Sequence, residues 1–135
     1  LYRVSADGTT TEFGPMIDLG ECAMLTGVTL DSRARVFVAV ANYDPSCGEA
    51  SPANGVLTVS RFGVHRVLTM PSGTFANGVV VHRGKVYVTD SDNGSVWAGP
   101  AYRKSAPTEP WFTSSLLTPT EEILLGANGN LSFGA

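Results

Sequence analysis

The chain has 135 residues, of which 43% are hydrophobic and 16% charged, and its formal net charge is −3. This composition is that of an ordinary globular domain, and nine dispersed Lys and Arg residues predict no surface for nucleic acid or for an anionic membrane. Polar residues interrupt each apolar run before it reaches the roughly 20 residues that cross a bilayer, so we expect no membrane-spanning segment.

The sequence starts inside a strand-like segment and lacks the basic and apolar regions of a signal peptide, which leaves the compartment open. Short segments rich in Val, Thr, Phe and Tyr then recur between Gly, Pro, Asn and Asp residues, a pattern typical of β-strands. The predicted strands are residues 1–4, 27–30, 36–40, 56–60, 64–69, 78–81, 86–89 and 95–98.

Helical spacing of apolar residues occurs only in residues 115–125, where Pro119 interrupts it, so the sequence predicts an all-β fold. The pairs Asn54-Gly55 and Asn93-Gly94 predict hairpin turns, because Asn and Gly tolerate the positive φ of a type I′ turn. The segment 126–130 predicts a flexible turn.

Cys22 and Cys47 are the only cysteines, and neither belongs to a Cys-x-x-Cys motif or lies near a pair of histidines. This spacing argues against a zinc site. It leaves open whether the two residues form one disulfide or remain buried thiols.

A repeat of strand, polar turn and strand is visible at a spacing of 51 residues. The first copy is 27–31 followed by 35–39, and the second is 78–82 followed by 85–89. Each copy continues with an Asn-Gly pair, a third strand and a fourth strand, near 64–69 and near 111–113 respectively.

Four short strands in about 40 to 50 residues are typical of one blade of a β-propeller. We therefore expect a partial propeller, with the end of a blade in 1–20, blades in 21–70 and 71–115, and the start of a next blade or a connecting loop in 116–135. Because Phe133-Gly134 resembles Phe75-Ala76, a further copy is expected to open after it. A closed propeller needs at least four blades, which predicts that the rest comes from a longer chain or from association of copies.

Residues 75–81, 85–91 and 94–97 resemble blades of the SMP-30/gluconolactonase/LRE-like six-bladed propellers, with Asn-Gly opening the innermost strand and Asp-Ser ending the next. The preceding unit, 26–31 with 35–38, resembles the blade before it, and the resemblance extends from residue 1 to about 111. It implies a six-bladed fold and a divalent cation, calcium or zinc, at the mouth of a central channel.

The same resemblance implies that Asn77 is a metal ligand, since it matches the family's Asn before Gly. An amide oxygen is a suitable neutral ligand for such a cation, and we expect the backbone at Gly78 to turn the side chain into the channel. The alternative is that Asn77 only caps a turn. The acidic ligands of the family are expected in blades outside this chain.

Asp44 falls where sugar-lactone-binding members carry a Glu that contacts the substrate, and it is the predicted substrate-binding residue. Ala23, Leu25 and Thr26 stand where those members have Arg, Asn and Asp, which counts against recognition of sugar lactones.

The remaining polar residues favour structural roles. Asp90 and Ser91 predict a turn, and His65 and His82 have no nucleophile motif that would suggest a catalytic triad. Packing between blades is the expected role of the aromatic residues Phe37, Phe62, Tyr87, Trp97 and Trp111.

The resemblance implies a metal-dependent hydrolase of a lactone or related ester, acting on a small-molecule substrate. Two alternatives remain open at this stage. One is a strictosidine-synthase-like propeller enzyme that needs no metal, and the other is a propeller that serves as a binding scaffold without catalysis.

Overall fold

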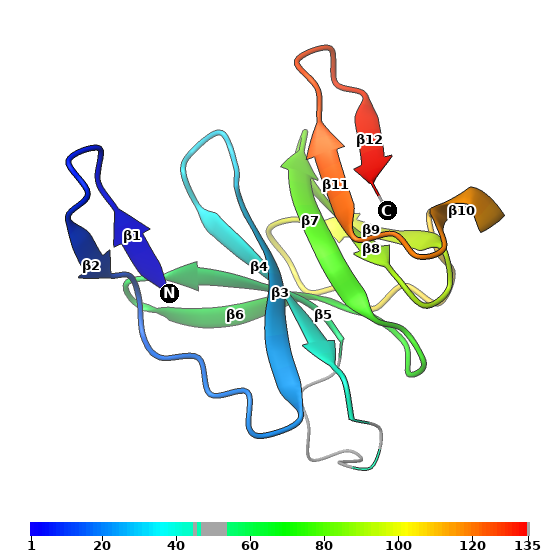
Figure 1. Cartoon of the computed structure of the whole chain (residues 1–135), viewed down its shortest axis with the longest axis horizontal. Helices are drawn as coiled ribbons and strands as arrows, with labels where there is room; N and C mark the ends of the chain where they lie inside the picture. The colour runs from blue at the N-terminus through cyan, green and yellow to red at the C-terminus, as the bar shows by residue number, and fades with distance from the viewer. Residues whose placement is uncertain (45, 47–53, 135) are drawn as a thin grey trace.

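The computed structural model describes residues 1–44, 46 and 54–134, and its regular secondary structure is almost entirely β-strand, as the sequence predicts (Figure 1). Each predicted strand overlaps one of the strands observed. The strands are β1 (Tyr2–Val4), β2 (Thr10–Glu12), β3 (Ala23–Leu30), β4 (Val36–Asn42), β5 (Gly55–Ser60), β6 (Gly63–Thr69), β7 (Ala76–His82), β8 (Lys85–Asp90), β9 (Ser95–Pro100), β10 (Phe112–Thr113), β11 (Glu122–Leu125) and β12 (Leu131–Gly134).

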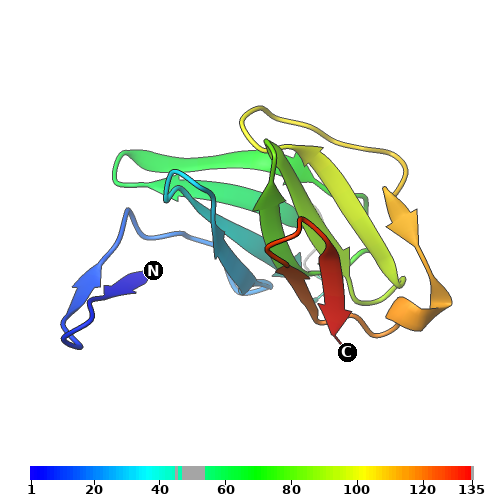
Figure 2. The same ribbon diagram turned by 90° about the horizontal axis from the view of Figure 1, so that it is seen from above.

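Two four-stranded antiparallel sheets form the centre of the molecule, in the orders β3-β4-β5-β6 and β7-β8-β9-β10. In both sheets each strand pairs with the next in the chain, and the two sheets pack face to face. The hairpins β1–β2 and β11–β12 lie at opposite ends of this arrangement, as Figures 1 and 2 show. The structure is thus a row of antiparallel sheets.

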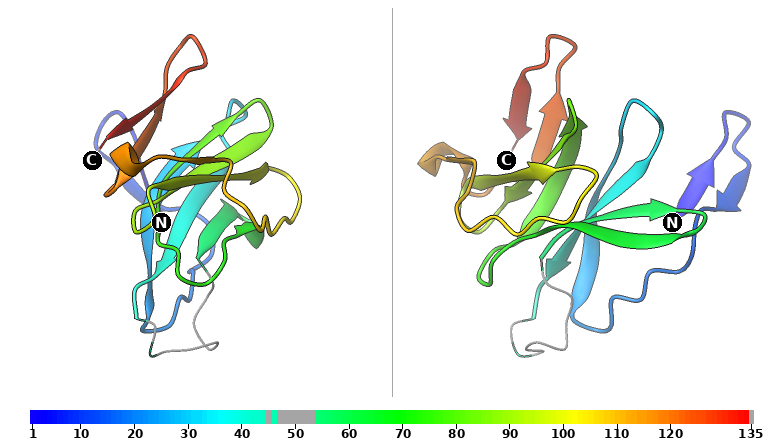
Figure 3. Two further views of the ribbon diagram at one scale, coloured as in Figure 1. Left: turned by 90° about the vertical axis from the view of Figure 1, so that its right-hand side faces the viewer. Right: turned by 180° about the vertical axis from the view of Figure 1, so that it is seen from behind.

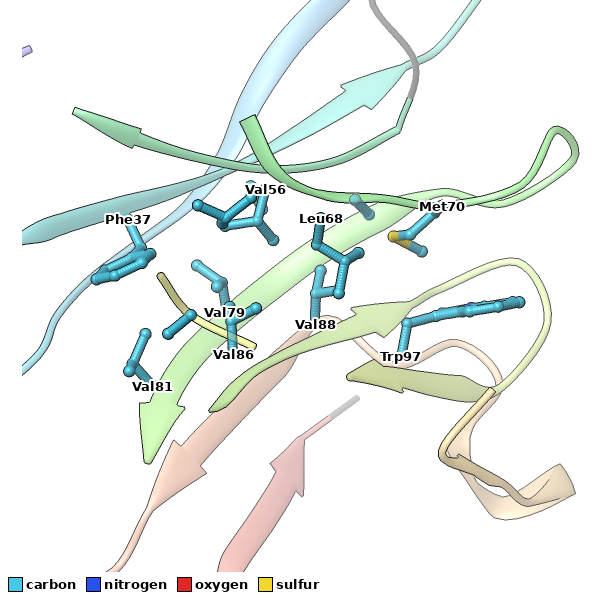
Figure 4. Close-up of a cluster of buried hydrophobic side chains, with 13 residues drawn as sticks. Phe37, Val56, Leu68, Met70, Val79, Val81, Val86, Val88 and Trp97 are labelled. Carbon is cyan, nitrogen blue, oxygen red and sulfur yellow. The ribbon is translucent and has the colours of Figure 1, made fainter. Parts of the chain in front are cut away.

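The burial of both faces of β4 explains why this strand is apolar over all but its last residue. Phe37 and Ala39 of β4 pack against the second sheet, whereas Val36 and Val38 face the opposite side, toward β1–β2. Side chains alternate between the faces of a strand, so a strand covered on both sides needs apolar residues at every position. Figure 4 shows this cluster, with Phe37, Val56 and Leu68 from the first sheet and Val79, Val86, Val88 and Trp97 from the second.

The aromatic residues divide between the core and the surface. Phe37 and Trp97 are buried, as expected, but Phe62 is 82% exposed and Trp111 is 53% exposed. Packing between sheets is therefore the wrong role for Phe62, which lies at a hairpin tip under the Arg61 guanidinium, 4.5 Å from its ring centroid. Trp111 contacts Tyr87 edge to face, with 5.1 Å between ring centroids.

Neither Asn-Gly pair forms the expected two-residue turn. Asn54-Gly55 stands at the start of β5, and Asn54 Oδ1 accepts backbone N–H groups of Asn42 at 3.1 Å and Ala76 at 3.4 Å. Asn54 thus joins the two sheets instead of turning the chain. Asn93-Gly94 does lie in the β8–β9 hairpin, but that loop spans 91–94, and of the pair only Gly94 has a positive φ.

The C-terminal segment, expected to be the start of a next blade or a connecting loop, forms a third strand-turn-strand unit. Residues 115–125 divide into the 3-10 helix η2 (Ser115–Leu117) and β11, and the turn expected at 126–130 leads into β12. Phe133-Gly134 belongs to β12, so the next unit opens at β11 and not after these residues. Ala135 lies outside the described residues.

The sequence left open a disulfide or two buried thiols, and in the structure Cys22 is disulfide-bonded. Cys47 lies outside the described residues. Among the residues that are described, no helix is long and apolar enough to span a membrane.

Candidate functional site

The first strands of successive sheets, β3, β7 and β11, lie side by side (Figure 3), and two glycines allow this close approach. A Cβ on Gly27 would lie 2.5 Å from the Asn77 carbonyl oxygen. A Cβ on Gly78 would lie 2.8 Å from the Ile123 nitrogen and 2.9 Å from the Glu121 carbonyl oxygen. The repeat of glycine at positions 27 and 78 therefore reflects backbone contact between neighbouring sheets.

An irregularity in each of the first two strands determines where their polar residues point. The register of β3 against β4 shifts between Leu25 and Gly27, and that of β7 against β8 shifts between Ala76 and Val79. Such β-bulges re-aim a side chain. They place Thr26 and Asn77 at equivalent positions, so a bulge within β7 takes the place of the turn expected at Gly78.

Hydrogen bonds fix both bulges. Thr26 Oγ1 donates to the carbonyl oxygens of Ala76 at 2.8 Å and Asn77 at 3.3 Å, which ties β3 to β7. The Gly78 N–H, released from the strand ladder, donates to Oγ1 of the buried Thr89 at 2.8 Å. The Gly78 N–H displaced by the β7 bulge thus retains a partner.

The side-chain amide of Asn77 is held at one end. Its Nδ2 donates to Ser91 Oγ at 3.1 Å, and Ser91 Oγ donates to the Thr120 carbonyl oxygen at 2.5 Å. Asn77 Oδ1 accepts no hydrogen bond from the described residues. Because Nδ2 is anchored, this oxygen is oriented and remains able to accept a bond or bind a cation.

Asn77 lies in the wall of a polar cavity of about 490 Å³ between β3, β7 and β11. Glu121 and Glu122 line the same cavity, whereas none of the described residues that line it is Lys or Arg. Its lining residues are Thr26, Gly27, Val28, Asn77, Gly78, Val79, Glu121, Glu122, Ile123 and Leu124. The cavity therefore brings Asn77 together with two acidic residues, and amide and carboxylate oxygens are the ligands that a hard cation prefers.

Asp44, the predicted substrate-binding residue, does not line this cavity. Its Oδ1 accepts the Ser46 hydroxyl at 2.5 Å and the Ser46 N–H at 2.9 Å. These hydrogen bonds to Ser46 lower the pKa of Asp44 from its ordinary value. Asp44 has the contacts of a carboxylate that stabilises a local turn after β4.

Asp90 lies at the end of β8 and stabilises the turn there, as the sequence predicts. Asp90 is buried and accepts the Phe75 N–H at 3.0 Å, Asn93 Nδ2 at 2.9 Å and Trp97 Nε1–H at 3.2 Å. Ser91 does more than turn the chain, because it connects the Asn77 amide to the segment that leads into β11.

Glu121 and Glu122 are the residues that the sequence analysis missed. The sequence left their segment as the start of a next blade or a connecting loop, without aligning it to the first two copies of the repeat. An alignment of 122–125 with 78–81 as a strand would have placed Glu121 at the position of the repeat that is equivalent to Asn77. The signal is weak, since the third copy has Glu where the first two have Gly.

Among the described residues, no group of three or more His, Cys, Asp or Glu side chains is arranged to hold a metal ion. The described lining of the cavity contains only two acidic residues, Glu121 and Glu122, so a set of three oxygen ligands would also need the Asn77 amide. In comparisons with known proteins, no family model and no curated protein matches this chain.

Proposed function

We propose that this chain is part of a β-propeller similar to the SMP-30/gluconolactonase/LRE-like family, and that it contributes to a metal-dependent hydrolase of a lactone or related ester. The row of antiparallel sheets supports the fold, because the first strands of successive sheets adjoin one another as the inner strands of blades do. The blade limits 21–70 and 71–115, six-bladed closure and substrate contact by Asp44 stay predictions.

The observation that carries the functional proposal is the oriented Oδ1 of Asn77 in a polar cavity that Glu121 also lines. Asn77 and Glu121 would bind a divalent cation, calcium or zinc, through their oxygens. Ser91 keeps the Asn77 amide from rotating, so the oxygen is presented without an entropic cost at binding. A bound cation of this kind polarises a substrate carbonyl and lowers the pKa of water.

Cation binding by the 135-residue chain tests this proposal. We expect calorimetry to detect Ca²⁺ or Zn²⁺ binding, and we expect Asn77→Ala and Glu121→Gln each to weaken it at least about tenfold. The first substitution removes an oxygen ligand, and the second replaces a charged carboxylate with a neutral amide. Glu12→Gln is the matched control, because Glu12 is an exposed carboxylate on β2 that does not line the cavity.

Unchanged affinity in Asn77→Ala, with an unchanged circular dichroism spectrum, would reject the metal site. Hydrolysis of lactone and aryl ester probes, measured with and without a chelator, then separates the alternatives. Turnover that survives chelation would favour a metal-independent enzyme, and binding without turnover would favour a scaffold.

A further inference from the structure

The two flanking hairpins are complementary halves of the four-stranded sheet that the chain builds twice. β11–β12 corresponds to the first two strands of a sheet, because β11 lies against β7 as β7 lies against β3. β1–β2 corresponds to the last two strands of a sheet, because it precedes β3 and its hairpin region covers the face of β4 that carries Val36 and Val38. One hairpin of each kind supplies the four strands of one sheet.

Each hairpin has an edge strand without a partner among the described residues. Backbone hydrogen bonds from β1 to β2 involve alternate positions, including Leu1 and Ser5. Bonded and non-bonded pairs alternate in an antiparallel ladder, so the peptide groups of Tyr2 and Val4 face the open edge. That edge, like the outer edge of β12, can accept another strand.

The face of β3 is uncovered where the equivalent face of β7 is covered. Val28 and Leu30 are 65% and 58% exposed beside a hollow of about 740 Å³, whereas the equivalent Val79 and Val81 are buried under the preceding sheet. The repeat thus indicates that the missing cover is the first strand pair of a sheet. β11–β12 is such a pair, and its Leu124 is 62% exposed.

A second hollow, of about 440 Å³, lies between β8, β10 and β12 and is lined by Tyr87, Trp111 and Leu131. By the same repeat, the last strand pair of a sheet should cover it. β1–β2 is such a pair, and Tyr2 and Val4 are its most exposed apolar side chains. The two hollows and the two exposed hairpins therefore match one another across the ends of the chain.

We propose that two copies of this chain associate head to tail through these ends. β12 of one copy pairs antiparallel with β1 of the other and completes a four-stranded sheet. Leu124 covers Val28, and Tyr2 and Val4 fill the hollow beside Trp111. The contact is heterologous, and when it forms at both ends it closes a ring of two copies with six four-stranded sheets.

Light scattering over a wide concentration range tests the proposal on the 135-residue chain. We expect the mass of two 14.2 kDa chains for the wild type. The mass of one chain is expected for Leu124→Glu and for Val4→Glu, which bring an unpaired charge into the contact from opposite ends. Met16→Glu is the control, because Met16 is 92% exposed and lines neither hollow, and it should remain paired.

A wild-type mass of one chain, or a polydisperse series of masses, would overturn the proposal. A pair that survives both Leu124→Glu and Val4→Glu would overturn it too. Circular dichroism confirms that the variants fold, and since they lie on separate hairpins, local unfolding of one leaves the other as a test. The readout is mass, so it is independent of cation binding and hydrolysis.

Discussion

Replacing Gly27 with Ala tests whether β3 and β7 need backbone contact. The new Cβ would lie 2.5 Å from the Asn77 carbonyl oxygen, a backbone atom that cannot rotate away. The strands would have to separate by about 0.5 Å to bring this distance to 3.0 Å, the lower limit of real Cβ contacts. That movement stretches the 2.8 Å hydrogen bond from Thr26 Oγ1 to the Ala76 carbonyl oxygen.

Overpacking of this kind costs about 1–3 kcal/mol, and the weakened hydrogen bond adds up to about 1 kcal/mol. We therefore expect Gly27→Ala to lower the free energy of unfolding by about 1–4 kcal/mol, measured by urea denaturation with circular dichroism. Gly63→Ala is the matched control. Its Cβ would meet only His65 Nε2, at 3.6 Å, so its effect should stay within about 0.5 kcal/mol. Equal effects of the two substitutions would refute the close approach.

Two further predictions concern buried carboxylates. Asp90→Ala leaves the Phe75 N–H and Trp97 Nε1–H without their acceptor, so we expect a loss of about 2–4 kcal/mol in urea denaturation followed by tryptophan fluorescence; a loss under about 1 kcal/mol would contradict this. At Asp31, burial raises the pKa, but hydrogen bonds from Arg35, Arg33 and Tyr102 outweigh it and lower the pKa from 3.8. Because the folded pKa is the lower one, its stabilisation is present above the unfolded value and lost as pH falls through the folded value, below about pH 5. The unfolding free energy of Asp31→Asn should therefore fall less steeply in acid than that of the wild type, and parallel curves would contradict the assignment.

The sequence predicted one half of the candidate site better than the other. Asn77 could be selected because its Asn-Gly pair begins a copy of the repeat, and the structure places it on a polar cavity. Glu121 could not be selected, because its relation to Asn77 depends on β11 lying beside β7. No local pattern encodes that contact, and the sequence left the segment open as the start of a next blade or a connecting loop.

The role of Ser91 shows the same limit. A Ser after Asp at the end of a strand is typical of a turn, and this local preference is correct for Asp90. Only the fold brings Ser91 within 3.1 Å of the Asn77 amide and within 2.5 Å of the Thr120 carbonyl oxygen. Asp44 was selected by the resemblance alone. Its carboxylate accepts hydrogen bonds from the nearby Ser46, a local contact that the resemblance did not predict.

The sequence by itself determined most of the strands, their order and the two four-stranded units, because side-chain alternation, β-branched residues and Gly or Asn punctuation act over a few residues. It also carried the two glycines, although not the reason for them. The tertiary structure decided which strands adjoin, where β3 and β7 bulge and which oxygens share a cavity. Those features depend on contacts between residues about 50 positions apart, such as the hydrogen bond from Thr26 to Ala76, and a local pattern does not specify such contacts.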